Sequence, residues 1–310
     1  MRLAPMTQLR ILFLGTSGSW PTIQRNVAST AIHRGSEVLL FDCGEGTQRQ
    51  FQRTSLSYMQ ITSIFITHFH GDHFLGLPGL IQTMQLNDRT QPLNLYGPPG
   101  MNKLAAQILT LGYFRPAYEI ISHEIDDGET LHFDDYDIRT MPTTHNVPSL
   151  AYSLEEHQRP GKFDKPKALA LGIPEGPLFS KLQHGQAITL KNGKKITPDM
   201  VLGPPRKGRK IVLSGDTTYD EALVPFAKDA DVLIHEATFD SSFAESAEYG
   251  HSTAAQAAAI AKQADVDALF LTHISPRYLD PKVIEDDART VFPRSFAAKD
   301  FQEIEVRLKP

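Results

Sequence analysis

Short apolar runs recur along this chain, and they constrain its fold more than any other feature. Each run contains three or four β-branched or large apolar residues and is followed within two residues by Gly, Thr, His or Asp. The runs are Ile11–Leu14, Val38–Phe41, Ile64–Ile66, Ile211–Leu213, Val232–Ile234 and Ala268–Leu271. Such patterns predict short strands, and apolar residues on both faces of a strand favour sheets that are covered on both sides.

Helical patterns lie between these runs. An alanine-rich stretch, Ser252–Ala264, opens with Thr253 followed three residues later by Gln256, which fits a capping box. Leu104–Leu111 and Thr47–Phe51 are weaker candidates for helices. Strands that alternate with helices predict an α/β fold.

Cysteine content and hydropathy exclude several classes of protein. Cys43 is the only cysteine of the 310 residues, so no intrachain disulfide and no cysteine-rich zinc module can form. No apolar run approaches the roughly 20 residues that cross a bilayer, and Ile11–Leu14 is too short for the core of a signal peptide. We therefore expect a cytoplasmic protein with no membrane and no disulfide partner.

The charge is distributed unevenly along the chain. The net charge of −5 argues against a nucleic-acid binder. Residues 161–210, however, contain eleven basic and three acidic residues, a net charge of +8, which leaves −13 on the rest of the chain. This stretch is rich in Pro and Gly and shows no sustained periodicity. It is either a solvated, mobile surface loop or a protruding arm that grips a polyanion.

The strongest motif is the sequence His-Phe-His-Gly-Asp-His at His68–His73, directly after a predicted strand. Side chains two residues apart in an extended segment project to the same side, so His68 and His70 can bind one cation. Gly71 allows a sharp turn, after which Asp72 and His73 can bind a second cation. The alternative is a polar loop in which the histidines coincide by chance.

Two cations need further ligands, and three candidates occur in the same context. His145, Asp216 and His273 each come shortly after a predicted strand, which for His145 is Ile138–Met141, although each alone is typical of an ordinary surface or cap residue. We choose Asp216 as the bridge, because a carboxylate can link two divalent ions about 3.5–4 Å apart. Imidazole and carboxylate ligands without a thiolate suit Zn²⁺, with Mn²⁺ or Fe²⁺ as alternatives.

A second pair of residues fits proton transfer. Glu236 follows a predicted strand, and His251 lies just before the predicted helix that starts near Thr253. A carboxylate that fixes the tautomer of an imidazole makes a proton relay. Either residue alone is more often structural.

These residues resemble the metallo-β-lactamase superfamily and, within it, the tRNase Z family in its short form. The motif His-x-His-x-Asp-His with the later His145, Asp216 and His273 is shared by many hydrolases of this superfamily. The motifs that are similar to tRNase Z in particular are Phe41–Gly46, Gly172–Pro177, His235–Thr238, His251–Thr253 and His273–Tyr278. The resemblance extends from about Ile11 to Tyr278 and continues weakly to the C-terminus.

The resemblance implies the fold and the organisation of the chain. It implies an αβ/βα four-layer sandwich, with a single catalytic domain over residues 1–310. Within that domain, residues 161–207 would form an inserted, flexible, basic arm that binds tRNA. The family uses the arm of one subunit to present tRNA to the active site of the other, so a homodimer is implied.

The resemblance also implies the reaction, the removal of the 3′ trailer from precursor tRNA, and its catalytic groups. Two Zn²⁺ ions per subunit would be bound, one by His68, His70 and His145 and the other by Asp72, His73 and His273, with Asp216 shared. Asp72 would orient the attacking water or accept its proton, and the Glu236–His251 pair would protonate the leaving 3′-oxygen. The products would be a tRNA with a 3′-hydroxyl and a trailer with a 5′-phosphate.

Substrate contacts are implied at five positions, namely Arg25, Asn26, Gly176, Pro177 and Arg277. Arg25 and Asn26 match the Pro-x-Lys-x-Arg-Asn loop that the family uses to handle the tRNA 3′ end, but Ile23 replaces its lysine. Two other functions are compatible with the residues. One is a phosphodiesterase of the same fold that acts on small phosphodiesters, and the other is a non-catalytic RNA-binding protein stabilised by metal.

Overall fold

The computed structural model describes residues 8–309, and the chain forms two compact units. Residues 8–155 and 210–307 make up the main unit. Residues 156–209, together with 308–309, make up the inserted unit. The predicted domain limits at residues 1 and 310 lie outside the described residues. The sequence predicts that one domain carries out catalysis and that an inserted arm at 161–207 binds tRNA. These two roles stay predictions.

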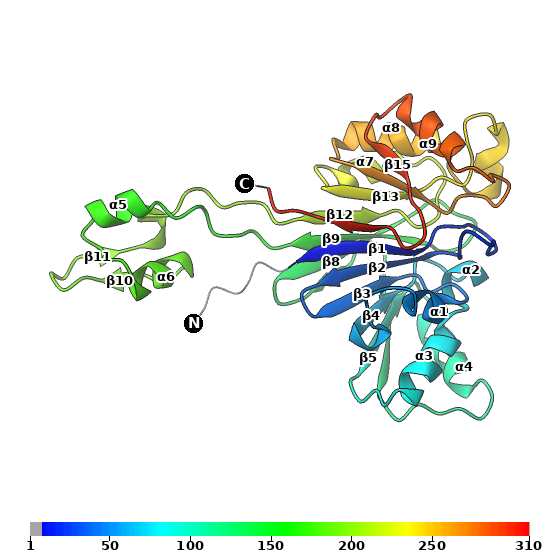
Figure 1. Cartoon of the computed structure of the whole chain (residues 1–310), viewed down its shortest axis with the longest axis horizontal. Helices are drawn as coiled ribbons and strands as arrows, with labels where there is room; N and C mark the ends of the chain where they lie inside the picture. The colour runs from blue at the N-terminus through cyan, green and yellow to red at the C-terminus, as the bar shows by residue number, and fades with distance from the viewer. Residues whose placement is uncertain (1–7, 310) are drawn as a thin grey trace. The chain divides into compact units, whose positions relative to one another are not determined.

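The main unit contains two seven-stranded sheets (Figure 1). The order of the first sheet is β16-β1-β2-β3-β4-β5-β6. Its strands are β1 (Leu9–Gly15), β2 (Ser29–Arg34), β3 (Glu37–Phe41), β4 (Ile61–Phe65), β5 (Leu93–Gly97), β6 (Ile120–Glu124) and β16 (Glu303–Glu305). The order of the second sheet is β15-β14-β13-β12-β9-β8-β7. Its strands are β7 (Thr130–His132), β8 (Tyr136–Pro142), β9 (Leu150–Glu156), β12 (Lys210–Leu213), β13 (Val232–Glu236), β14 (Leu269–Thr272) and β15 (Ser295–Ala297).

The apolar runs are strands with both faces buried, as predicted. Successive side chains of a strand point to opposite faces. In β1, Ile11 and Phe13 therefore join the core between the two sheets, whereas Leu12 and Leu14 join the core under the helices of the first sheet. In β14, Phe270 faces the central core, and its neighbours pack against the helices of the second sheet.

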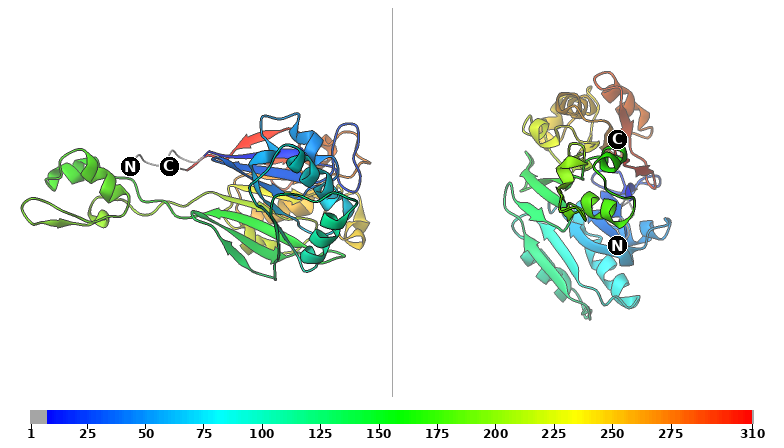
Figure 2. Two further views of the ribbon diagram at one scale, coloured as in Figure 1. Left: turned by 90° about the horizontal axis from the view of Figure 1, so that it is seen from below. Right: turned by 90° about the vertical axis from the view of Figure 1, so that its left-hand side faces the viewer.

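Helices cover the outer faces of both sheets. Against the first sheet pack α1 (Thr47–Phe51), α3 (Leu77–Leu86) and α4 (Met101–Thr110). Against the second pack α7 (Leu223–Ala227), α8 (Ala254–Ala264) and α9 (Lys282–Arg289). The two groups of helices lie on opposite sides of the sheets (Figures 1 and 2). The predicted αβ/βα four-layer sandwich is confirmed.

The predicted helices are also present, although α4 begins at Met101, three residues before the predicted start at Leu104. The Thr253 side chain accepts a hydrogen bond from the Gln256 backbone, and the Gln256 side chain accepts one from the Thr253 backbone, which is the predicted capping box. The helix predicted at Leu104–Leu111 corresponds to α4. The helix predicted at Thr47–Phe51 is α1.

One buried hydrogen bond joins the two sheets through the central core. The fully buried Tyr152 of β9 donates its hydroxyl to the Ile66 carbonyl at the end of β4, at 2.8 Å. Its ring packs edge-on against Phe41 and Phe65. The hydroxyl therefore gives a buried carbonyl its hydrogen-bond partner and helps to fix the position of one sheet against the other.

Tyr152→Phe should lower the free energy of unfolding by about 1–3 kcal/mol, because the Ile66 carbonyl loses its buried partner. Urea denaturation followed by circular dichroism measures this loss. Tyr113→Phe is the matched control, since Tyr113 is fully exposed, and its unfolding should be unchanged. Equal stability of the two variants would contradict a role for this bond.

The inserted unit is an ordered subdomain, so the interpretation of this stretch as a solvated loop is wrong. It contains α5 (Lys165–Ala170), α6 (Pro177–Gln183), η2 (Pro198–Met200) and the hairpin of β10 (Ile188–Thr189) and β11 (Lys195–Ile196), which is visible in Figure 2. These elements converge on a small core of Ala168, Ile173, Leu182, Ile188, Ile196 and Val201. The two helices α5 and α6 and the two strands each contribute one residue to this core, and Ile173 and Val201 lie outside these elements, so no periodicity shows in the sequence.

Paired backbone segments close the base of the inserted unit. Arg159 and Arg206 exchange two backbone hydrogen bonds, and the Gly203 N–H donates to the Lys162 carbonyl at 2.9 Å. Nearby, the buried Arg209 guanidinium donates to both carboxylate oxygens of Glu156, at 2.6 and 2.7 Å. A bidentate pair of this kind fixes the geometry of the two chain segments that enter and leave the unit.

Two expectations from the sequence concern membrane-spanning helices and the single cysteine. Within residues 8–309, no helix combines the length and the apolar character that spanning a membrane requires. Cys43 is buried, and this burial raises the pKa of its thiol. The lone cysteine is therefore an inert core residue.

Candidate metal centre

The predicted ligands lie at the ends of strands from both sheets. His68 follows β4, and His70, Asp72 and His73 lie at the start of the short helix α2 (Gly71–Phe74) or within it. His145 follows β8, Asp216 follows β12, and His273 follows β14. Residues that are as far apart in sequence as Asp72 and His273, a separation of 201 positions, are thus brought to one place.

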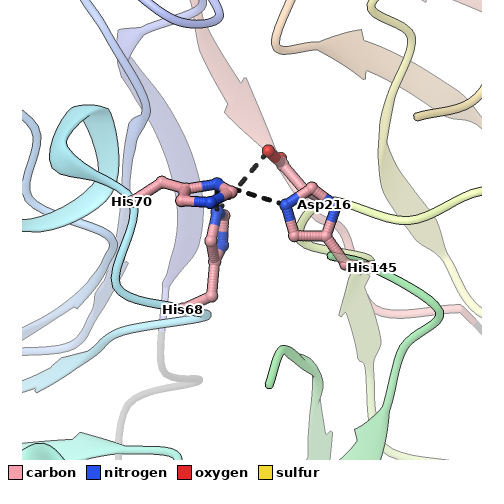
Figure 3. Close-up of side chains that lie close together, drawn as sticks. All are labelled: His68, His70, His145 and Asp216. Atoms are coloured by element: carbon pink, nitrogen blue, oxygen red, sulfur yellow. Dashed lines mark hydrogen bonds and ion pairs between the residues drawn. The ribbon is translucent and has the colours of Figure 1, made fainter. Parts of the chain in front are cut away.

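The first group of candidate ligands consists of His68, His70, His145 and Asp216, and Figure 3 shows their side chains facing a common centre. One ligand atom from each lies within 4.8 Å of the others. His70 Nδ1 is 3.0 Å from His68 Nε2 and 3.2 Å from His145 Nε2. Neighbouring ligands of a tetrahedral zinc ion are about 3.3 Å apart, so these separations suit such an ion.

The second group consists of Asp72, His73 and His273. Asp72 Oδ2 lies 3.2 Å from His273 Nε2 and 3.6 Å from His73 Nε2. His73 Nε2 is buried and has no hydrogen-bond partner. A buried imidazole nitrogen without a partner is costly, and a metal ion at this position would satisfy it.

Asp216 connects the two groups. Its Oδ2 atom lies 3.7 Å from His68 Nε2 of the first group. The same atom lies 3.4 Å from His73 Nε2 and 3.2 Å from His273 Nε2 of the second group. One buried carboxylate oxygen therefore faces both groups, which is the arrangement expected of a bridging ligand. The donor set of imidazoles and carboxylates fits a pair of divalent ions.

Further residues hold the imidazoles in position. His73 Nδ1 donates to Asp42 at 2.8 Å, and His145 Nδ1 donates to the Gly250 carbonyl at 2.7 Å. His273 Nδ1 contacts the Thr238 hydroxyl at 2.9 Å. Partners of this kind fix ring orientation and turn Nε2 toward the centre.

Sequence reasoning missed these supporting residues. Asp42 lies in the Phe41–Gly46 motif and Thr238 in the His235–Thr238 motif. Their place in these motifs could have indicated a role near the metal centre. Thr67 was a visible strand-end residue, and its backbone N–H and its hydroxyl both donate to Asp42. No spacing rule pairs Asp42 with His73, because 31 residues separate them.

The electrostatics of the centre favour the unprotonated forms of Asp216, His68 and His70. Burial opposes protonation of His73, but the Asp216 and Asp42 carboxylates raise the pKa of this imidazole well above its ordinary value when no metal is bound. Burial opposes ionisation of Asp216, but the facing His273 and His73 imidazoles hold the pKa of its carboxyl well below its ordinary value. Burial lowers the pKa of His68, and the neighbouring His73 adds to this effect. Burial and His145 likewise lower the pKa of His70. Deprotonated carboxylates and neutral imidazoles are the forms that bind metal.

Glu236 and His251 form the predicted pair beside this centre. His251 Nδ1 donates to Glu236 Oε1 at 3.0 Å. Glu236 is buried, and it also accepts backbone hydrogen bonds from Thr217, Thr238 and Ser252. Burial opposes the protonated form of His251, but the Glu236 carboxylate raises the pKa of this imidazole to about 9. His251 also lies close enough to Asp216 and His273 to be a metal ligand on distance alone.

Arg25 and Asn26 form hydrogen bonds with other residues of the chain. The Arg25 guanidinium donates to the Thr16 hydroxyl at 2.6 Å and to the Ala298 carbonyl at 2.8 Å, and burial lowers its pKa. The Asn26 side chain donates to the Glu45 carbonyl at 2.9 Å. Both residues therefore shape the loop around them, and their contact with a substrate stays a prediction.

This loop lies against the metal centre. The Ser19 N–H donates to Asp72 Oδ2 at 2.7 Å. A Cβ atom on Gly18 would lie 2.7 Å from His273 Cε1, so only glycine fits beside that imidazole. Ile23, at the position of the family's lysine, is fully exposed.

The other predicted substrate contacts are Gly176 and Pro177 in the inserted unit and Arg277 in the main unit. Gly176 and Pro177 begin helix α6 of the inserted unit, where the Gly176 φ of 135° favours glycine. Arg277 is exposed in the main unit and stacks on Phe239 and Phe243. The contact of these three residues with a substrate stays a prediction.

Comparison with known proteins identifies the family. Ribonuclease Z from Methanosarcina acetivorans is 48% identical over 97% of this chain and 99% of its own length. The chain belongs to the ribonuclease Z family. The human short-form tRNase Z, a member with a crystal structure, is 28% identical, with a TM-score of 0.71 over 96% of this chain and all of that one.

Two other similarities are narrower. The metallo-β-lactamase fold protein YhfI from Bacillus subtilis has a TM-score of 0.71 at 19% identity over 96% of this chain, which shows the fold alone. A family model described as Anti-Pycsar protein Apyc1 matches residues 9–158. That match includes the His68–His73 motif but ends before Asp216, so the ribonuclease Z relationship covers the metal centre more completely.

Proposed function

We propose that this chain is a metal-dependent endoribonuclease that removes the 3′ trailer from precursor tRNA. The observation that carries the proposal is the position of Asp216 Oδ2, within 3.2–3.7 Å of imidazole nitrogens from both ligand groups. Such a centre suits phosphodiester hydrolysis. The choice of substrate rests on near full-length similarity to ribonuclease Z and on the name tRNase Z of the human relative.

Two Zn²⁺ ions per subunit would be held here, with Mn²⁺ or Fe²⁺ as alternatives. His68, His70 and His145 would hold one ion, Asp72, His73 and His273 the other, and Asp216 both. Bound divalent ions supply Lewis acidity, which activates water and neutralises charge on the phosphate. Asp72 would orient the attacking water, and its oxygen is itself held by the Ser19 N–H.

The Glu236–His251 pair would supply the proton. Glu236 accepts from His251 Nδ1, which leaves Nε2 as the atom that can give its proton to the leaving 3′-oxygen. The tRNA product then carries a 3′-hydroxyl, and the trailer carries a 5′-phosphate. The buried hydrogen bonds to Glu236 keep its carboxylate fixed during the transfer.

His251→Ala should slow single-turnover cleavage by about 10²–10⁴-fold, because general acid catalysis is lost, while the metal content stays at the wild-type level. Elemental analysis and rapid-quench kinetics measure the two quantities. His123→Ala is the matched control, since His123 hydrogen-bonds Asn94 on the first sheet. Loss of an ion from His251→Ala would instead make His251 a metal ligand.

Residues 161–207 would bind the tRNA backbone, with Gly176 and Pro177 at the start of α6 among the contacts. The lysines of this segment are exposed, and Lys165 forms an ion pair with Glu175 at 2.8 Å. The positive charge suits a sugar-phosphate surface. We also infer a homodimer that acts in the cytoplasm, a compartment that suits a lone buried thiol.

Incubation of the purified protein with a 3′-extended precursor tRNA, with and without chelator, tests the proposal. Mapping both product ends should show a 3′-hydroxyl on the tRNA and a 5′-phosphate on the trailer, and chelator should stop the reaction. Rapid hydrolysis of cyclic nucleotides with an intact precursor would favour the small-phosphodiester enzyme. Tight tRNA binding by metal-loaded protein without cleavage would favour the non-catalytic protein.

A further inference from the structure

Three aromatic side chains lie on one loop between the His235–Thr238 and His251–Thr253 motifs. We call Phe239, Phe243 and Tyr249 the aromatic cluster. Phe239 and Phe243 stack with ring centroids 4.2 Å apart, and Tyr249 lies 5.8 Å from Phe243 and 6.2 Å from Phe239. The loop contains the short helix η3 (Ala244–Tyr249).

Exposure increases across the aromatic cluster. Phe239 is 5% exposed, Phe243 is half-buried, and Tyr249 is 57% exposed. The two phenylalanines therefore support the tyrosine from inside. The Tyr249 ring presents a free surface large enough to stack on a planar group.

The backbone at Tyr249 is tied to the metal centre. The Tyr249 carbonyl accepts a hydrogen bond from the Asn146 side chain at 3.1 Å, and the next carbonyl, of Gly250, accepts from His145 Nδ1 at 2.7 Å. His145 is a proposed metal ligand. A group bound on Tyr249 would thus be held at a fixed position relative to the ions.

Arg277 adds a positive charge to this surface. Its guanidinium carbon lies 4.5 Å from the ring centre of Phe243 and 4.8 Å from that of Phe239, which is cation–π geometry. The side chain is exposed, and no carboxylate within residues 8–309 forms an ion pair with it. Its planar face is therefore held on the rings while its edge can donate to an anion such as a phosphate.

The position of His251 indicates which nucleotide this surface would hold. The Phe239 ring lies 6.2 Å from the His251 ring, so the aromatic cluster is on the His251 side of the centre. In the proposed reaction, His251 protonates the leaving 3′-oxygen. That oxygen belongs to the nucleotide on the 5′ side of the cut, the last one that the tRNA retains.

We propose that Tyr249 stacks on the base of this last retained nucleotide and that Arg277 pairs with its 5′-phosphate. The inference rests on the proposed function and makes both residues determinants of where the chain is cut. Stacking accepts any base, because every base has a π-face, and it suits an enzyme that processes many different tRNAs. A hydrogen-bonding pocket would restrict the identity of the base.

A substrate with an abasic site at the last retained nucleotide tests the stacking. Tyr249→Ala should lower kcat/KM for the intact precursor tRNA about 10- to 100-fold, and Tyr249→Phe should retain the wild-type value. With the wild-type protein, kcat/KM for the abasic substrate should be lower than for the intact precursor by the same factor. Tyr249→Ala should cleave the abasic and the intact substrate with equal kcat/KM. Elemental analysis should find the same metal content in all three proteins, which shows that the centre is intact.

The same design applies to Arg277 with a methylphosphonate in place of the 5′-phosphate of that nucleotide. The uncharged linkage should reduce cleavage by the wild-type protein and have no effect on Arg277→Ala. Losses that multiply between variant and substrate would overturn the assignment for either residue, as would wild-type cleavage that is indifferent to the abasic site. A wild-type protein that leaves precursor tRNA intact would instead contradict the proposed function itself.

Discussion

Asp216→Asn should reduce the bound metal to at most one ion per chain and slow cleavage of precursor tRNA by about a thousandfold or more. The carboxylate oxygen Oδ2 faces imidazoles of both ligand groups, so a neutral amide of the same shape removes a ligand from both. The centre is held together by the side chains around it, and the fold should survive. Elemental analysis and single-turnover kinetics give the two numbers, and circular dichroism checks the fold.

Asp265→Asn is the matched control for this variant. Asp265 ends helix α8 in a left-handed conformation that asparagine tolerates, and its side chain is 82% exposed. This control should keep both ions and the wild-type rate. Two ions and a normal rate in Asp216→Asn would show that Asp216 does not bridge the groups.

Deletion of Phe163–Leu202 from the inserted unit should reduce cleavage of precursor tRNA and leave hydrolysis of a small phosphodiester by the metal centre nearly unchanged. Lys162 and Gly203 face each other across a backbone hydrogen bond of 2.9 Å, so an Asn-Gly turn can replace Phe163–Leu202 and leave the base of the unit paired. Cleavage of precursor tRNA should fall by about a hundredfold or more, because the phosphate contacts are lost. Hydrolysis of bis(p-nitrophenyl) phosphate should change less than about twofold, since the deleted segment contributes no proposed ligand.

A charge variant shows whether the lysines or the fold of the segment matter. Replacing the six lysines of the deleted segment with glutamine leaves its apolar core unchanged, because no lysine belongs to that core. These are Lys165, Lys167, Lys181, Lys191, Lys194 and Lys195. The variant should show the same selective loss and a weaker dependence of KM on salt. Equal loss of both activities in the deletion would mean that the segment is structural.

The central strands could be predicted from sequence because burial on both faces leaves little room for polar residues. The run Val38–Phe41 became β3, with its side chains divided between two cores. β2 (Ser29–Arg34) was hidden, since all six of its residues are buried although four of them are polar or charged. Edge strands such as β16 were hidden for the opposite reason, because few of their residues are buried.

Other elements depend on contacts that sequence spacing does not encode. Helix α3 begins with Leu77-Pro78-Gly79, which resembles a turn, yet proline is favoured in the first turn of a helix and the buried leucines hold it in place. The inserted unit has its own core only because short elements meet. A continuous motif such as His68–His73 is visible in one sequence, whereas the supporting contact of Asp42 with His73 needs the folded chain.

Anomalous diffraction at the zinc edge, from crystals of natively purified protein, tests the central claim most directly. We predict two peaks per chain, one among His68, His70, His145 and Asp216 and one among Asp72, His73, His273 and Asp216. Both peaks should disappear after treatment with chelator and return when zinc is added. Crystals grown with added zinc that show no peak at these side chains, or a peak elsewhere, would contradict the account.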